Sequence, residues 1–415
     1  MAGEGFTILH ASDFQLDVPL GGFRWIPEAI EEEVLGAPEV AALRVFDLAI
    51  KHQVDMVALT GNLLCPGKSS ARCLSFLSGQ FARMHEHDIP VVWATGASDP
   101  LDAWPTSISW PDSSIRFDRG SVDRRVMTLG GIDIEVLGCG SDAAGNIHPK
   151  WFDGLSRGEH QLVIGGGTVD SFKKLEAAEL WLLGGRSYAE HLVDGSANIF
   201  YAGVPQGRCL ADSGPRGAQL IHVSEQVECT KLDCSAIRYE NINIDAGAIN
   251  NLDDLELKLC EYAEFYSWKP DRINLVHWDV NCKQSTSAFH DTNTTFMQWQ
   301  QKFGQQSMSS SSSVYTLSVN VHYGHENAVA TDGEDLLSDY LFALASLREN
   351  GWSQMTLAGT EELEEATNDW VRVAEDLEGL RTLDDAAQLG ELLLGGYANP
   401  LPNPPTDSNI EPEAA

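Results

Sequence analysis

Between Phe6 and Ala202, short apolar runs alternate with amphipathic stretches, and this alternation constrains the fold more than any other feature of the sequence. Short apolar runs bounded by glycine, asparagine or aspartate are typical of buried strands, whereas apolar residues spaced three or four apart predict helices. The alternation predicts an α/β architecture built in layers. The predicted strands are Phe6–Ala11, Met56–Thr60, Pro90–Ala94, Ile132–Leu137, Gln161–Ile164, Leu180–Leu183 and Ile199–Ala202, and the predicted helices are Ala37–Gln53 and Ala71–His87.

Several of the predicted strands run directly into a short polar or glycine-containing loop. In open α/β folds such strand-end loops carry the binding and catalytic groups, so a site is expected there. The triplet Gly165–Gly167 predicts a tight turn or an anion cradle, and it is not a P-loop because no Gly-Lys-Ser/Thr follows it. The strand-end loops are Ser12–Asp13, Gly61–Asn62, Gly96–Asp99, Gly165–Gly167 and Gly184–Gly185.

The rest of the chain divides by pattern and charge. Leu255–Phe265 predicts a helix, Arg272–Val280 predicts a strand, and the serine-rich run Ser307–Ser313 predicts a flexible loop. The expected domains are an α/β core over residues 1–224, a smaller α+β domain over 225–330, an acidic helical segment over 331–398 and a disordered, proline-rich tail over 399–415.

The segment that begins at Asp332 is strongly acidic, with nineteen acidic and three basic residues from there to Ala415. Glu334–Arg348 and Glu361–Leu380 have helical patterns. Apolar residues spaced three or four apart on such an acidic background indicate either a docking helix or a solvated face. The candidate docking residues are Leu336, Leu337, Tyr340, Leu341, Leu344 and Leu347.

The net charge of the whole 415-residue chain is −34, which repels phosphate backbones. Any contact with DNA is therefore expected to be weak, or to be made through a basic partner. No apolar run is long enough to span a membrane, and Met1–His10 lacks the features of a signal peptide. The eight scattered cysteines contain no Cys-x-x-Cys pair and are expected to be reduced thiols. These observations predict a cytoplasmic protein that is not attached to a membrane.

Six stretches at the predicted strands and their loops form an ordered series: Ile8–Leu20 (with Leu-His-Ala-Ser-Asp-Phe-Gln-Leu), Asp55–Leu63, Pro90–Pro100, Val163–Val169, Leu180–Ser187 and Tyr201–Arg208, which ends in Pro-Gln-Gly-Arg. In this order they resemble the motifs of calcineurin-like metallophosphoesterases, and specifically those of the nuclease subunit of the DNA double-strand-break repair nuclease–ATPase complex. The resemblance implies a four-layer β-sandwich flanked by helices, a small α+β capping domain over the second region and, in this chain, an acidic helical tail.

In that family two manganese ions lie at the strand ends, where Asp, His and Asn side chains hold them. Most of the corresponding positions are replaced in this chain. Asp13 is the one family residue of eight that is unchanged. Gln15 stands in place of a histidine, Asn62 in place of the bridging aspartate, Ala97 in place of an asparagine, Ser98 in place of the histidine proposed as general acid, and Gly166, Gly185 and Ser187 in place of later histidines.

Two divalent ions need several anionic or imidazole ligands to offset their dehydration, and this set does not supply them. The expected protein is a pseudoenzyme that binds no metal cofactor. One alternative is an active metal-dependent phosphodiesterase or exonuclease with a shifted site built on Asp17, Asp99 or Asp170. Another is an interaction scaffold unrelated to DNA, because a fold does not fix a function.

Other polar residues in these motifs have structural interpretations. His10 is expected to be a buried structural histidine, and Asp99, before Pro100, a turn residue. Arg208 is expected either to support a tight turn or to contact a phosphate or a partner's carboxylate. Arg186, at a former ligand position, is a candidate anion contact or a salt-bridged surface residue.

The resemblance also implies partners. The family's nuclease subunit works as a dimer and docks on the coiled-coil base of an SMC-like ATPase through a segment that follows the capping domain. In this chain the acidic stretch after Asp332 occupies that place. The expected role is therefore a non-catalytic or regulatory subunit that works with such an ATPase, with homodimer formation as a further expectation.

Overall fold

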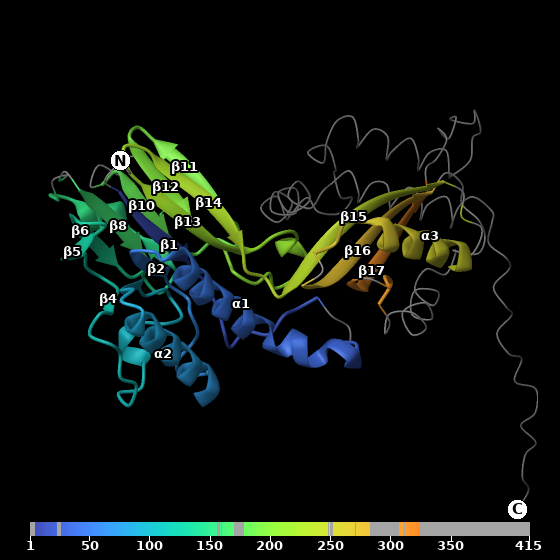
Figure 1. Ribbon diagram of the computed structural model, residues 1–415, viewed down its shortest axis with the longest axis horizontal. Coiled ribbons are helices and arrows are strands. Elements are labelled where there is room, and N and C mark those ends of the chain that lie inside the picture. The colour runs from blue at the N-terminus through green and yellow to red at the C-terminus, as the bar shows by residue number, and fades with distance from the viewer. Residues whose placement is uncertain are drawn as a thin grey trace, which may run out of the picture. The chain divides into compact units, whose positions relative to one another are not determined.

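The computed structural model describes residues 5–22, 26–155, 158, 160–169, 178–247, 249, 252–269, 271–282, 307–310 and 312–323 (Figure 1). Asp170, the acidic segment with its candidate docking residues and the proline-rich tail lie outside these ranges. No helix in the described ranges is both long and apolar enough to cross a bilayer. All eight cysteines are described, and each is a free thiol.

Two six-stranded mixed sheets form the core. The first has the order β14-β13-β1-β2-β3-β4, and β1 to β4 run parallel while β13 and β14 are antiparallel. Its strands are β1 (Phe6–Ala11), β2 (Met56–Thr60), β3 (Val91–Ala94), β4 (Ile115–Phe117), β13 (Gly217–Val223) and β14 (Val227–Asp233).

The second sheet has the order β11-β12-β10-β8-β6-β5, with four parallel strands in the middle and an antiparallel strand at each edge. The strands β7 (Asn146–Ile147) and β9 (Thr168–Val169) form a separate two-stranded sheet whose Ile147 and Val169 pack in one apolar cluster with residues of the second sheet. The strands of the second sheet are β5 (Asp123–Leu129), β6 (Ile132–Cys139), β8 (Gln161–Gly165), β10 (Leu180–Leu183), β11 (Glu190–Asp194) and β12 (Ala197–Tyr201).

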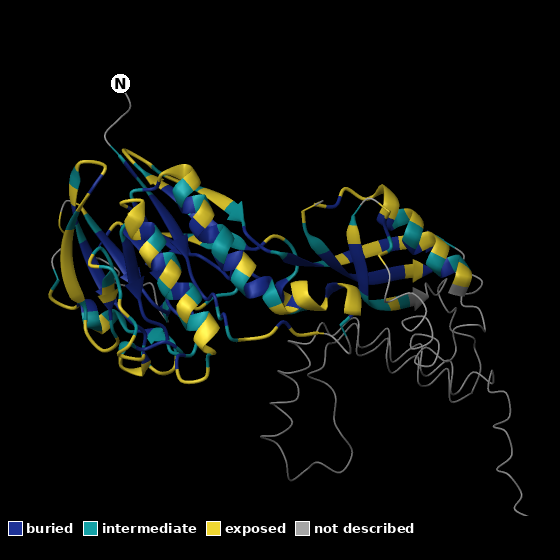
Figure 2. Cartoon of the chain, turned by 60° about the horizontal axis from the view of Figure 1, so that its bottom comes forward, coloured by how far each residue is buried: buried dark blue, intermediate teal, exposed yellow. Residues whose placement is uncertain are grey.

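The two sheets pack face to face through one apolar cluster, to which both sheets contribute buried residues such as Ile8, Met56, Val136 and Leu182. The opposite face of the first sheet is covered by α1 (Glu31–His52) and α2 (Ala71–Glu86). In Figure 2 the inward stripes of both helices are buried and their outward stripes are exposed. The layered α/β fold class predicted from the alternating pattern is confirmed.

The long helix α1 differs from its prediction at its first turns. It begins at Glu31, not at Ala37, and Pro38 lies inside it. A helix that began at Ala37 would have Pro38 in its first turn, where proline is favoured. Here Val34 and Ala37 are buried in an apolar cluster with residues from later in the chain, such as Tyr239. This tertiary packing extends the helix through the proline.

The third sheet contains three parallel strands in the order β15-β16-β17. They are β15 (Ile237–Gly247), β16 (Ile273–Cys282) and β17 (Ser313–Tyr323), and α3 (Leu252–Phe265) follows β15. The Tyr262 ring of α3 packs edge-on against Trp278 of β16, with 5.9 Å between ring centroids. The domain boundary expected between residues 224 and 225 falls in the turn of the β13–β14 hairpin, and β14 belongs to the first sheet.

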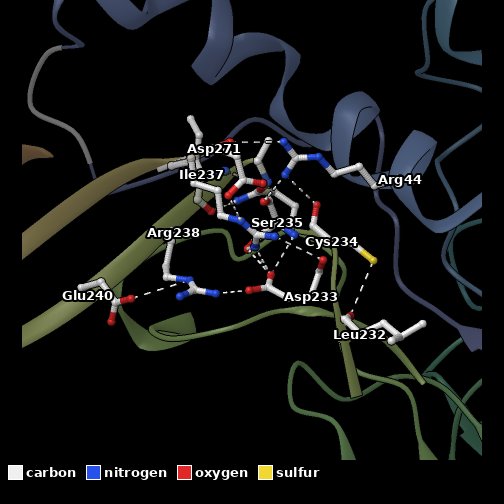
Figure 3. A network of polar contacts seen from close by, with 12 residues as sticks. Arg44, Leu232, Asp233, Cys234, Ser235, Ile237, Arg238, Glu240 and Asp271 are labelled. Atoms are coloured by element: carbon white, nitrogen blue, oxygen red, sulfur yellow. Dashed lines mark hydrogen bonds and ion pairs between the residues drawn. The ribbon is translucent and has the colours of Figure 1, made fainter. Parts of the chain in front are cut away.

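A partly buried ionic network holds the link between β14 and β15 (Figure 3). The carboxylate of Asp233 accepts hydrogen bonds from the guanidinium groups of Arg238 and Arg272. Arg44, on α1, donates to the backbone oxygens of Cys234 and Ser235. Residues from a core helix, from the last strand of the first sheet, from β15 and from the position just before β16 therefore meet at one point.

Candidate functional site

The loops that follow β1, β2 and β3 meet at the carboxyl ends of these parallel strands, as the strand-end rule predicts. The backbone N–H of Asp13 donates to the carbonyl of Gly61 at 2.9 Å, and that of Gln15 donates to the carbonyl of Asn62 at 3.0 Å. The N–H of Ser141, after β6, donates to the carbonyl of Thr95 at 2.9 Å. The strand-end loops of the two sheets are thus joined through their own backbones.

Three of the sequence-predicted residues form one hydrogen-bonded chain. The amide nitrogen of Asn62 donates to Oδ1 of Asp13 at 2.8 Å. Its amide oxygen accepts from the N–H of Ser98 at 3.2 Å and from the hydroxyl of Ser98 at 3.1 Å. The second carboxylate oxygen of Asp13 accepts from the N–H of Gly185 at 2.8 Å. The loops after β1, β2, β3 and β10 are therefore connected through Asp13 and Asn62.

Asp99 is fully buried beside this chain and acts as an internal acceptor. Its Oδ1 accepts from the N–H groups of Asn62 at 3.0 Å and Gly96 at 2.6 Å, and its Oδ2 accepts from Leu63 at 2.9 Å. Burial raises the pKa of this carboxyl to about 6, although the three backbone donors act in the opposite direction. Burial also raises the pKa of Asp13. Asp99 was expected as a simple turn residue, and it also ties the β2 loop to the β3 loop.

Glycines occupy the positions at which the loops approach one another most closely. A Cβ atom built on Gly166 would lie 1.9 Å from the carbonyl oxygen of Thr95, and one on Gly96 would lie 2.4 Å from Oδ1 of Asn62. Gly185 has φ of +83°, a conformation that side chains rarely adopt. Of the family's histidine positions, Gly166 therefore has backbone surroundings that leave no space for a side chain, and Gly185 has a backbone conformation that disfavours one.

The backbone is strained at the same place. Asp13, Gln15 and Asn62 have φ of 52°, 44° and 54°, in the left-handed region that costs energy for residues other than glycine. Such conformations persist only where the surroundings determine them. Here the hydrogen bonds between the loops maintain the left-handed conformations of these three residues.

These residues do not fit a two-metal centre. Asp13 and Asp99 are the two carboxylates of the cluster, and each already accepts hydrogen bonds on both oxygens. Within the described part of the chain, no group of three or more His, Cys, Asp or Glu side chains is arranged to hold a metal ion. Asp17, part of the alternative shifted site, accepts from the N–H of Cys65 at 3.1 Å and is used in that loop.

The two arginines singled out in the sequence are engaged within the chain. Arg186 forms an ion pair with Glu190 and lies over the ring of Tyr201, 3.9 Å from its centroid. Arg208 donates to the backbone oxygens of Phe14, Gln15 and Val18, so it supports the loop after β1. Burial lowers the pKa of the Arg208 guanidinium to about 10.

The Pro-Gln-Gly-Arg segment also reaches the third sheet, a link that its sequence did not reveal. The side-chain oxygen of Gln206 accepts from the N–H groups of Ala236 and Ile237 at 2.9 and 3.1 Å, and its nitrogen donates to the carbonyl of Ile237 at 2.7 Å. The hydroxyl of Tyr239 on β15 donates to the carbonyl of Arg208 at 3.2 Å. Through these hydrogen bonds the segment connects the strand-end loops to β15.

His10 has the structural role expected from its apolar neighbours. It is fully buried in β1, where Nε2 lies 3.0 Å from the hydroxyl of Thr60 and Nδ1 lies 3.3 Å from the amide oxygen of Gln219. Burial lowers the pKa of His10 to about 3, so it is neutral at physiological pH. Its contacts join β1 to both neighbouring strands of the first sheet.

No family model matches the chain. An uncharacterised metallophosphoesterase of Bacillus subtilis (strain 168), YhaO, is 26% identical over 235 residues, which is 52% of this chain. The chain spans 57% of the length of that relative. This similarity supports a place in the metallophosphoesterase superfamily, in agreement with the resemblance of the six motifs.

Solved structures of similar chain trace include a dimetal phosphatase from Danio rerio, with 8% identity, a TM-score of 0.35 and coverage of 55% of this chain and 97% of that one. A putative 5′-nucleotidase from Staphylococcus aureus has 11% identity, a TM-score of 0.33 and coverage of 63% and 59% of the two chains.

Proposed function

We propose that this chain, which resembles the calcineurin-like metallophosphoesterases, is a non-catalytic member of that superfamily and serves as a structural or regulatory subunit. The observation that carries the proposal is the hydrogen-bonded chain from Gly185 through Asp13 and Asn62 to Ser98. It uses the oxygens of the unchanged family aspartate for contacts within the protein.

The chemistry of the donor set supports the same proposal. Hydrolysis of a phosphodiester by two metals requires ligands that hold both ions, so that one of them can activate water. An amide at position 62 has no negative charge to bridge two cations, and Ser98 lacks the titratable imidazole of a general acid. The backbone around Gly166 leaves no room for a replacement ligand on that loop.

Metal and cleavage assays on the full chain test this proposal. After incubation with manganese and removal of free ions, we expect no stoichiometric manganese by mass spectrometry and no degradation of linear DNA. The Asp13→Ala variant shows whether any cleavage depends on the unchanged family aspartate. Two tightly held ions per chain with end degradation of linear DNA would contradict the proposal and favour the active alternative; degradation that Asp13→Ala retains would place the site on other residues, such as Asp17, Asp99 or Asp170.

The partner implied by the motifs is an SMC-like coiled-coil ATPase, and we propose that the acidic segment after Asp332 docks on a basic surface of its coiled coil. Two observations support this docking proposal: the order of the six motifs, and the composition of residues Asp332–Ala415, which contain nineteen acidic and three basic residues. The free thiols support a reducing compartment such as the cytoplasm.

Truncation tests the docking proposal. A chain that lacks Asp332–Ala415 is expected to lose co-purification with such an ATPase, because the acidic segment supplies both charge complementarity and the apolar stripe. Co-purification that survives truncation would rule out this docking segment. Failure of the full chain to bind any coiled-coil ATPase would favour a scaffold unrelated to DNA repair.

A further inference from the structure

The loops after β1, β2, β3 and β10 converge at the strand-end cluster, and a group other than two cations must connect them. In a metal centre, the ions themselves connect ligands from separate loops. Here the same loops converge, and three non-glycine positions, Asp13, Gln15 and Asn62, have positive φ, which the surrounding contacts must maintain.

We propose that Asn62 is a structural cross-link that takes the place of a bound cation and fixes the loops after β1, β2, β3 and β10 to one another. This inference rests on the proposed function, because it concerns the same cluster. It goes further by assigning to one side chain the connecting role that metal ions would otherwise have.

The amide of Asn62 is suited to this role because its two ends have opposite hydrogen-bonding character. Its nitrogen faces Asp13, which needs a donor, and its oxygen faces the N–H and hydroxyl of Ser98, which need an acceptor. Its backbone takes part as well: the N–H donates to Asp99 at 3.0 Å, and the carbonyl accepts from Gln15 at 3.0 Å.

The side chain is also held in position by its neighbours. The amide oxygen would lie only 2.4 Å from a Cβ on Gly96, so the β3 loop closes directly over it. Asp13 extends the connection to the fourth loop through its bond to the N–H of Gly185. The Asn62 amide thus contacts the β1 and β3 loops directly and reaches the β10 loop through Asp13, in addition to the backbone bonds and the Asp99 contacts between the loops.

The test is the isosteric variant Asn62→Asp. It removes the donor that faces Asp13 and places a second carboxylate where a nitrogen lay 2.8 Å from an Asp13 oxygen. We expect the thermal midpoint to fall by about 5–10 °C, because a bond to a charged group is lost and like charges are brought together. Addition of manganese is expected to restore none of this loss.

Two further variants keep the test decisive. Asn198→Asp on β12 makes the same chemical change where the side-chain oxygen contacts His191 at 3.0 Å on the surface, and its midpoint should stay within about 2 °C of the native value. Asn62→Ala removes the cross-link without adding charge, and is expected to lose stability even if Asn62→Asp does not fold.

Two results would overturn the inference. One is a thermal midpoint for both Asn62 variants as close to the native value as that of Asn198→Asp. The other is stoichiometric manganese bound to Asn62→Asp with recovery of its midpoint, because the cluster would then accept a cation. Manganese and cleavage in the native chain would instead contradict the proposed function, so the two failures are distinguishable.

Discussion

Replacement of Asp233 by alanine is expected to lower the free energy of unfolding by about 3–5 kcal/mol. Asp233 accepts from the guanidinium groups of Arg238 and Arg272, whose side chains are only 10% and 9% exposed. Its Oδ1 also accepts from the hydroxyl of Ser235 at 2.8 Å. Removal of the carboxylate leaves the two nearly buried guanidinium groups with the longer ion pairs to Glu240 and Asp271, both at 3.6 Å, and the loss of their close partner lowers the stability. Asp233, Arg238 and Glu240 are shown in Figure 3.

Urea unfolding of the native chain, Asp233→Ala and Asp123→Ala measures this effect. Asp123 pairs with Arg125 at 3.8 Å, and both side chains are more than half exposed, so its loss should cost less than about 1 kcal/mol. Both variants remove an aspartate carboxylate, so their difference reports how much more the Asp233 contacts with two nearly buried arginines contribute than one exposed ion pair. Equal effects from both would show that the network at the β14–β15 link contributes no more than a surface pair.

Introduction of histidine at Gly166, the residue type of the family, is expected to destabilise the protein by more than about 4 kcal/mol and to create no metal site. The new Cβ would lie 1.9 Å from the carbonyl oxygen of Thr95 and 2.8 Å from that of Ala94, both of which are backbone atoms at the end of β3. Backbone cannot move aside as a flexible side chain can, so β3 and β8 would have to separate.

Gly79→Ala provides the matched control, because Gly79 lies in α2 and a Cβ there meets no atom within 4 Å. That variant should gain up to about 1 kcal/mol from better helix propensity. The thermal midpoint, recorded with and without manganese, is the measurement. A Gly166→His protein as stable as the native chain, or one stabilised by manganese, would contradict the prediction.

The buried parallel strands were predictable because their signal does not depend on the partner strand. β2, β3 and β10 are buried at every position, and their sequences are accordingly continuous apolar runs. β5 and β14 carry no such signal, since most of their residues are exposed or half-buried at sheet edges. Their assignment requires the hairpin partner, which periodicity within a single segment does not reveal.

The candidate site was predictable in its location and residue types but not in its bonding. The motifs place Asp13, Asn62 and Ser98 at strand ends, and the structure brings them together. The left-handed backbone of Asp13 and the contact between Gly166 and the Thr95 carbonyl depend on how two sheets pack. No local pattern encodes that packing, so the extent to which the loops close on one another could not be read from the sequence.

The position of β1 between β2 and β13 has a consequence for synthesis of the chain on the ribosome. Phe6 pairs with Val223, whereas Ile8 on the other edge of β1 pairs with Met56. At about 5–20 residues per second, Val223 is translated on the order of 10–40 s after Phe6. Until the β13–β14 hairpin is made, β1 is an edge strand of the first sheet in addition to β4, and an open edge can pair with other chains. A nascent-chain chaperone that covers β1 until the β13–β14 hairpin emerges would protect the protein during this interval.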